Sequence, residues 1–175
     1  LCLYCHEDMR KKIDKATLVH GAVTDKKSCI NCHSPHASNE KRFLVSDTKT
    51  LCLSCHDRTY VSGNRKIYNI AQILQKSKSV HGAIEKAGCT GCHDPHASSN
   101  PFLLDKAFPS GSYAPAVKES FALCFTCHKS EIIEKAVTTT ATGFRNGDKN
   151  LHVVHINGEK GRSCSLCHNP HGSPN

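Results

Sequence analysis

Six copies of the pattern Cys-x-x-Cys-His contain every cysteine of this 175-residue chain. The cysteine pairs are Cys2/Cys5, Cys29/Cys32, Cys52/Cys55, Cys89/Cys92, Cys124/Cys127 and Cys164/Cys167. The histidines that directly follow them are His6, His33, His56, His93, His128 and His168. This pattern is typical of covalent c-type haem attachment, in which two thiols bond one porphyrin and the histidine lies under its iron. We therefore predict six covalently attached haem c groups, numbered haem 1 to haem 6 in chain order.

Zinc sites and disulfide bridges are the two other structures that paired cysteines commonly build. Two Cys-x-x-Cys pairs can supply the four thiolates of one structural zinc site, and twelve cysteines can form bridges among themselves. Neither structure needs a histidine after every pair, so the six histidines favour haem.

The composition leaves little material for a core of side chains. Aromatic residues make up 6% of the chain, and there is no tryptophan. Since a chain of this length normally buries a substantial core, we expect the haems to fill the interior. The predicted fold is mainly coil with short α-helices and little or no β structure. Helices are expected within residues 66–78, 115–123 and 130–137, and residues 138–150 are expected to form a loop.

The chain is built from two-haem repeats. In each full repeat a Val-His pair precedes an A-type motif, Cys-x-x-Cys-His-x-Pro-His, and a B-type motif, Leu-Cys-x-x-Cys-His, follows. We predict one six-haem unit over residues 1–175. Its parts are a partial repeat with haem 1 (1–19), a repeat with haems 2 and 3 (20–79), a repeat with haems 4 and 5 (80–151) and a partial repeat with haem 6 (152–175).

The formal net charge of +8 does not indicate nucleic-acid binding, because the anionic propionates of six haems would offset most of it. Haem c is attached outside the cytoplasm, so we expect an extracellular or cell-surface location, otherwise a periplasmic one. No apolar run has the length of a membrane-spanning helix. A signal peptide is expected to have been removed, because Leu1 already lies in a motif.

Seven histidines lie outside the six motifs, and six irons need at most six distal ligands. Three of them, which we call clamp histidines, are the last residue of an A-type motif, three residues after its haem-binding histidine: His36, His96 and His171. Two intervening residues cannot carry the chain around a porphyrin, so a clamp histidine should bind a neighbouring haem. Pro35, Pro95 and Pro170 stiffen these short connections. The Val-His histidines are His20, His81 and His155, and His152 is the seventh.

The repeat suggests a pairing of these histidines with the irons. The predicted pairs are His20 with His33, His36 with His56, His81 with His93, His96 with His128, and His155 with His168. Haem 1 then lacks a distal ligand. We predict that His171 of one subunit binds haem 1 of the next, which gives a head-to-tail oligomer or filament; His152 of the same chain is the alternative. Met9 is expected to be an ordinary side chain.

The segments Cys29–His56 and Cys89–His128 carry the pattern C-x-x-C-H-x-P-H-x-S followed by L-C-x-x-C-H. They resemble the doubled C-x-x-C-H cytochromes, multihaem proteins that pass electrons across or outside bacterial envelopes. The resemblance implies low-spin haems with two histidine ligands, packed closely in one series. It also implies partners that are redox proteins or extracellular electron acceptors.

Two functions fit these features. The first is electron transfer without catalysis, because two histidine ligands on every iron leave no site for a substrate. The second is a multihaem reductase of the nitrite or hydroxylamine type, which needs one open iron. Haem 1 is the candidate for an open iron, although no Cys-x-x-Cys-Lys motif occurs.

Overall fold

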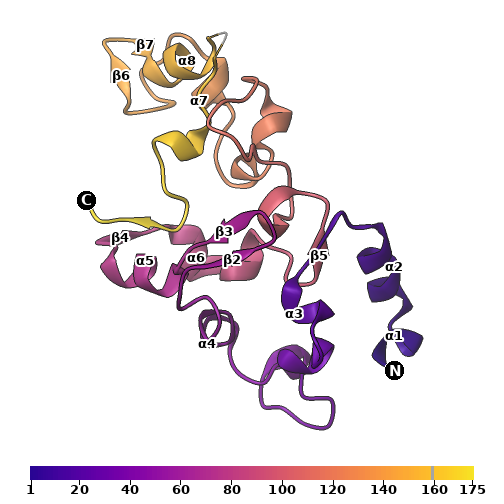
Figure 1. Cartoon of the computed structure of the whole chain (residues 1–175). Helices are drawn as coiled ribbons and strands as arrows, with labels where there is room; N and C mark the ends of the chain where they lie inside the picture. Colours follow the sequence, from indigo (N-terminus) through magenta and orange to yellow (C-terminus); the bar gives the residue numbers. More distant parts are fainter. Residues whose placement is uncertain (159) are drawn as a thin grey trace.

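The computed structural model describes residues 1–158 and 160–175, and most of them are coil, turns and short helices (Figure 1). The α-helices are α1 (Cys2–Cys5), α2 (Glu7–Lys15), α3 (Gly21–Thr24), α4 (Thr48–Leu53), α5 (Ile70–Lys76), α6 (Gly82–Ala87), α7 (Glu131–Glu134) and α8 (Leu151–Ile156). The strands are β1 (Leu18–Val19), β2 (Tyr60–Ser62), β3 (Arg65–Ile67), β4 (Ser79–Val80), β5 (Ala97–Ser98), β6 (Arg145–Asn146), β7 (Lys149–Asn150) and β8 (Gly172–Ser173). Single 3-10 turns also occur throughout the described chain. The predicted fold class is confirmed, and the β structure is limited to short antiparallel pairs.

The expected helices are shorter than their patterns suggested. Within residues 66–78 the helix α5 begins only after Asn69, whose side chain accepts a hydrogen bond from the Gln72 amide at 2.8 Å. The preceding residues instead form the hairpin β2–β3, whose turn contains Gly63 with φ +57°. Glycine adopts this conformation without steric cost. The expected loop 138–150 likewise contains the hairpin β6–β7, with Gly147 at φ +58°.

Two strand pairs connect successive repeats. Strand β1 pairs antiparallel with β5, and β4 pairs antiparallel with β8. In each case the strand that ends directly before the Val-His histidine of one repeat lies beside the strand that follows the clamp histidine of the next repeat. The His20 amide donates to the His96 carbonyl at 2.9 Å, and the His81 amide donates to the His171 carbonyl at 3.3 Å. The pairs therefore bring histidines of neighbouring repeats together.

The segment after each A-type motif of the two full repeats folds in the same way. His33 and Leu44 form an isolated β-bridge, as do His93 and Leu104. Two adjacent residues with positive φ make each loop turn back, with φ 61° and 56° in the first repeat and φ 59° and 56° in the second. The carbonyl of the first of these residues lies 2.9 Å from Nδ1 of the motif histidine in both repeats.

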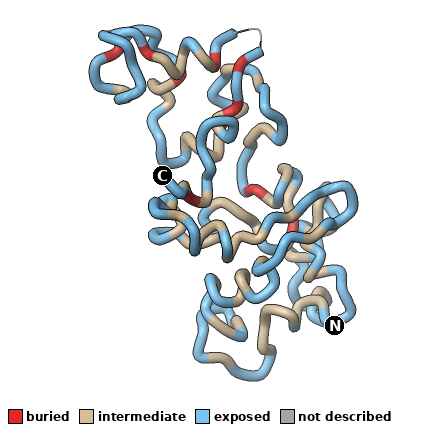
Figure 2. Tube along the Cα trace, turned by 60° about the vertical axis from the view of Figure 1, so that its left-hand side comes forward, coloured by how far each residue is buried: buried red, intermediate tan, exposed pale blue. Residues whose placement is uncertain are grey.

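Few side chains are buried. Within the described residues the buried apolar side chains are Ala97, Leu104, Phe121, Ile133 and Ile156. The last three form one cluster beside α7 and α8, and the buried positions are widely scattered along the tube in Figure 2. No helix among residues 1–158 and 160–175 combines the length and apolar character needed to cross a bilayer.

Gly172 is the tightest point of the contact between β4 and β8. A Cβ at this position would lie 2.8 Å from Ser77 Cβ and 3.0 Å from the Ser79 carbonyl oxygen. We expect Gly172→Ala to destabilise the protein by about 1–3 kcal/mol, because the strands must separate. Denaturant unfolding measures this change. Gly82→Ala is the control, since a Cβ there meets nothing within 4 Å; a comparable loss in both variants would contradict the prediction.

Candidate haem-binding sites

Five pairs of histidine rings face each other with nearly parallel planes. Every pair joins one motif histidine with one histidine from outside the motifs. The pairs are His20–His56, His33–His96, His81–His128, His93–His171 and His152–His168. Their ring centroids are 6.1–6.4 Å apart, and their planes differ by 6–17°.

This spacing fits a metal ion between the rings. Imidazole nitrogens bind transition metals at about 2 Å, so two rings on opposite sides of one ion have centroids about 6 Å apart. The rings also lie beside the cysteine pairs that the motifs provide for a porphyrin. The residues present therefore fit an iron porphyrin with one imidazole on each face.

Several of these rings are held by a hydrogen bond at Nδ1, which leaves Nε2 for a metal. Nδ1 of His33 lies 2.9 Å from the Arg42 carbonyl oxygen, and Nδ1 of His93 lies 2.9 Å from that of Phe102. His152 has Thr142 Oγ1 at 3.1 Å. A partner of this kind fixes the tautomer and orientation of a metal-binding histidine.

Five of the ten paired histidines are biased toward the neutral form that binds metals. Burial lowers the pKa of His20, His56, His96, His152 and His171, since it disfavours the imidazolium ion. At His96 the Asp94 carboxylate opposes this effect, but the pKa still lies below the ordinary value.

The pairing predicted from the sequence is wrong. The predicted partner of His20 was His33, but its ring faces His56; the predicted partner of His81 was His93, but its ring faces His128. A Val-His histidine thus belongs with the B-type motif of its own repeat. The physical reason is the strand pairing, which turns the Val-His segment toward the next repeat.

The predicted partners of the clamp histidines are also wrong. His96 faces His33 and not His128, so a clamp histidine belongs with the A-type motif of the preceding repeat. His171 obeys the same rule and faces His93 of its own chain. Because its ring is used within the chain, the predicted contact of His171 with haem 1 of another subunit is corrected. His152 faces His168. It is therefore not available as the distal ligand of haem 1, which was the alternative prediction.

Three histidines have no facing histidine ring within the described part of the chain: His6, His36 and His155. His6 and His36 are exposed. The predicted partners of His36 (His56) and His155 (His168) are both taken by other rings. The half-buried His155 has its Nδ1 2.7 Å from the Leu151 carbonyl oxygen and its ring 5.6 Å from that of Phe144. Met9 lies within α2.

Five of the twelve predicted haem-attachment cysteines are exposed. Cys55, Cys127 and Cys167, the second cysteines of their motifs, are exposed rather than buried. Cys2 and Cys5 of the first motif are exposed as well, and the other seven cysteines are half-buried.

The three exposed second cysteines lie in short turns. The amides of Cys55, Cys127 and Cys167 donate to the carbonyl of the first cysteine of the same motif, at 3.3, 3.2 and 3.2 Å. Each of these three motifs is thus a single turn whose second cysteine is exposed, whereas Cys32 and Cys92 make the same turn and are half-buried. A thiol must be accessible to react, so the exposure of Cys55, Cys127 and Cys167 is compatible with their predicted role.

Cysteine side chains of consecutive motifs lie close enough to affect each other's pKa. The neighbouring pairs are Cys32/Cys55, Cys52/Cys89, Cys92/Cys127 and Cys124/Cys164. The contact with Cys52 lowers the pKa of the Cys89 thiol to about 6. The contacts alternate between the second and the first cysteines of neighbouring motifs. The predicted attachment points of haems 2 to 6 therefore form one continuous series.

The zinc and disulfide interpretations gain no support from the structure. A metal ion bound only by side chains needs at least three ligands close together. Within the described ranges, 1–158 and 160–175, no three His, Cys, Asp or Glu side chains are arranged in this way. A structural zinc site needs four ligands around each ion. All twelve cysteines lie in the described ranges and are free thiols.

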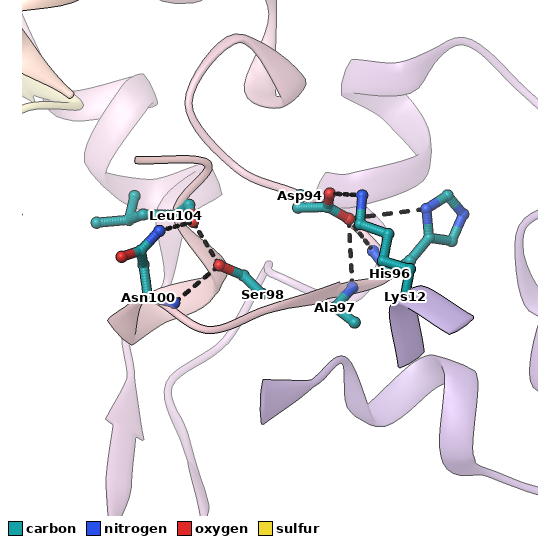
Figure 3. A network of polar contacts seen from close by, with 7 residues as sticks. All are labelled: Lys12, Asp94, His96, Ala97, Ser98, Asn100 and Leu104. Carbon is teal, nitrogen blue, oxygen red and sulfur yellow. Dashed lines mark hydrogen bonds and ion pairs between the residues drawn. The ribbon is translucent and has the colours of Figure 1, made fainter. Parts of the chain in front are cut away.

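An acidic residue that the sequence motifs do not include fixes the backbone at the clamp histidine His96. Asp94 forms an ion pair with Lys12 of α2, and its Oδ1 accepts hydrogen bonds from the amides of His96 at 3.0 Å and Ala97 at 3.2 Å (Figure 3). Burial alone would raise the pKa of Asp94, but the Lys12 ammonium and the two backbone amides together outweigh it, and the pKa is lowered. Asn169 has the same role for the His171 amide, at 3.0 Å. The sequence feature that could have identified both residues is an Asp or Asn directly before the proline of the motif, since these side chains often accept hydrogen bonds from backbone amides in turns.

Asn150 positions the helix that carries His152. It is fully buried; its Nδ2 donates to the carbonyls of Ile132 at 2.9 Å and Lys135 at 2.8 Å, and its Oδ1 accepts from the His152 amide at 3.0 Å. We expect Asn150→Leu to cost about 2–4 kcal/mol of unfolding free energy, because two carbonyls lose their donor and α8 loses its cap. Thermal and denaturant unfolding measure it. Asn157→Leu, at an exposed position after α8, is expected to change stability by less than about 0.5 kcal/mol; equal losses would refute the role of Asn150.

Comparison with known proteins agrees with this geometry. The family model described as "Doubled CXXCH motif" matches residues 20–60 and 81–132, which are more than half of the chain. A multiheme cytochrome MtrA of Shewanella baltica (strain OS185) is 26% identical over 192 aligned positions, which cover 98% of this chain and 46% of that protein. The chain thus spans less than half the length of this curated relative. The chain belongs to the doubled C-x-x-C-H family of multihaem c-type cytochromes.

Proposed function

We propose that this protein conducts electrons along six covalently attached c-type haems and is not itself an enzyme. The observation that carries the proposal is the series of five facing histidine pairs, joined by neighbouring cysteines from motif to motif. The similarity to a multiheme cytochrome supports it. When bound, the iron supplies a reversible one-electron change.

The chain's own residues then have three tasks. The twelve cysteines attach the porphyrins, and the six motif histidines are proposed as proximal ligands. His20, His81, His96, His152 and His171 are proposed as distal ligands. Two imidazoles on one iron leave no open position for a substrate, so these sites favour electron transfer over catalysis.

The proposed unit is the whole of residues 1–175, with the two-haem repeats as its subdivisions. The strand pairs support this view, because each connects one repeat to the next. We place the protein outside the cytoplasm, periplasmic or extracellular, where haem c is attached. Other redox proteins or extracellular acceptors are the proposed partners. A head-to-tail homo-oligomer would need a donor other than His171. Among the described residues outside the C-x-x-C-H motifs, His36 and His155 are the histidines without a facing histidine ring.

Intact-mass spectrometry and redox titration of the matured protein test the main proposal. We expect six covalently bound porphyrins and reversible reduction of all of them. The double variant Cys164→Ala/Cys167→Ala should carry one haem fewer and otherwise keep the spectrum. A protein with empty C-x-x-C-H motifs would contradict the proposal.

A reductase activity at haem 1 is the second candidate, because the His6 ring has no facing ring in the described chain. It predicts cyanide binding at one haem and turnover of nitrite or hydroxylamine. Both properties should vanish in Cys2→Ala/Cys5→Ala. Cyanide binding without turnover would favour the electron-transfer function alone.

A further inference from the structure

The segment after the clamp histidine His36 is folded like the segment after His96, but no strand of the described chain pairs with it. Ser38 donates its hydroxyl to the Leu44 carbonyl, and Ser98 makes the same bond to the Leu104 carbonyl. The Glu40 amide donates to Ser38 Oγ at 2.9 Å, as the Asn100 amide does to Ser98 Oγ. The loop after His36 is therefore folded like the one after His96.

The surroundings of these two loops differ at one point. Ala97 follows His96 and is only 1% exposed, because β1 covers it, and Gly172 is buried under β4 in the same way. Ala37 follows His36 and is exposed. No strand of the described chain pairs with residues 36–38, whose edge can still form backbone hydrogen bonds.

A hollow lies directly beside this unpaired edge. It has a volume of about 470 Å³ and is lined by Ser34, Ala37, Ser38, Asn39, Glu40 and Val45. The same segment therefore offers a free strand edge, a free imidazole and space for a partner.

The two completed copies of this contact identify the partner. In each, one repeat supplies both parts: its Val-His strand pairs with the edge, and its A-type motif histidine faces the clamp histidine. We propose that residues 36–38 and the adjoining hollow are the docking surface for a further doubled C-x-x-C-H repeat, whose Val-His strand pairs with this edge and whose A-type haem takes His36 as its distal ligand. This inference rests on the proposed function only in requiring c-type haems.

A second copy of the chain in this conformation does not offer that partner. Its strands β1 and β4 are already paired, and Val154-His155 lies within helix α8. Its A-type histidines His33, His93 and His168 all have facing rings. The docking repeat is therefore a unit other than those of residues 1–175.

The chain itself supplies a probe for this surface. A peptide of residues 79–93, with haem attached to Cys89 and Cys92 and with His81→Ala, carries a Val-His-type strand and an A-type haem whose sixth position is open. It is titrated into the 175-residue holoprotein, in which the number of haems has been established by mass. We expect saturable one-to-one binding and conversion of the peptide iron from high spin to low spin, followed by difference absorption.

Two variants separate the two parts of the contact. His36→Ala should weaken binding by about tenfold or more, since the iron loses its ligand. Ala37→Arg keeps the imidazole but obstructs the edge, and should also weaken binding. Both residues are exposed, so an unchanged spectrum of the protein's own haems verifies that the variants fold. His155→Ala is the matched control and should bind normally.

The outcomes that overturn the proposal are distinct. Equal binding by His36→Ala excludes the ligand, and equal binding by Ala37→Arg or by a haem peptide of residues 87–93 excludes the strand pairing. Loss of binding in His155→Ala would place the peptide elsewhere. Self-association of the protein that His36→Ala abolishes would make a second copy the occupant and reject the one proposed. A protein that carries six reducible haems but does not bind the peptide would refute this inference and leave the proposed function intact.

Discussion

The apoprotein, made where haem cannot be attached, is expected to give the circular dichroism of an unfolded chain and no cooperative thermal transition. Only five apolar side chains are buried in the described residues, and three of them form a single cluster at one end. A fully buried large apolar side chain stabilises a fold by about 1.5–3 kcal/mol. Such a core cannot hold the remaining loops, so the haems and their ligand bonds must supply the rest, as metals do in small metal-dependent domains.

The holoprotein and the variant Cys2→Ala/Cys5→Ala are the references for this experiment. The variant loses only haem 1, whose motif histidine faces no other ring among the residues described, and should keep a cooperative transition. A sigmoidal unfolding curve of the apoprotein would show that side chains alone suffice.

His96→Ala is expected to convert one low-spin haem of the isolated protein to high spin, whereas His36→Ala should convert none. The two histidines occupy the same position in the same Pro-His-Ala-Ser sequence, but only His96 has a facing ring, 6.1 Å from that of His33. Removing an imidazole from an iron opens its sixth position. Electron paramagnetic resonance of the oxidised proteins counts the high-spin haems.

Double variants then locate the affected haem. In a background without haem 2, Cys29→Ala/Cys32→Ala, His96→Ala should add no further high-spin signal. In a background without haem 5, Cys124→Ala/Cys127→Ala, it should still add one. The reverse result would restore the pairing of His96 with His128 that the repeat pattern had suggested.

The attachment motifs could be predicted from the sequence because all their parts lie within five consecutive residues. The thin core and the short helices followed from composition, and the structure agrees. The distal partners could not be predicted, since they depend on the two-residue strands β1, β4, β5 and β8. Strands this short leave no alternating pattern, and their pairing joins segments about 80 residues apart, as for Val19 and Ala97.

The exposure of the individual motif cysteines could not be predicted either, because it depends on how the rest of the chain packs. The exposure of Cys55, Cys127 and Cys167 differs from that of their half-buried partners Cys52, Cys124 and Cys164, although all lie in the same motif. The motif fixes the spacing of the two thiols, but which of them is covered depends on contacts with distant segments.

Helix starts and hairpins show the same limit. The residues Asn69 and Asn150 begin α5 and α8 through side-chain hydrogen bonds, and asparagine is equally common in turns. The hairpins β2–β3 and β6–β7 each form around a glycine with positive φ. The sequence around those glycines resembled an ordinary loop.

The pairing of each clamp histidine with the A-type motif of the preceding repeat has a consequence for the rate of folding. His96 follows His33 by 63 residues, whereas His20 precedes it by only 13. Short loops close at lower entropic cost than long ones, so during refolding the nearer imidazole should reach the iron first and form a misligated intermediate. Escape from this trap requires breaking a metal bond and is therefore slow. Refolding of the haem-loaded chain at about pH 7 should show a slow phase, and His20→Ala should remove it, because the nearer imidazole is then absent.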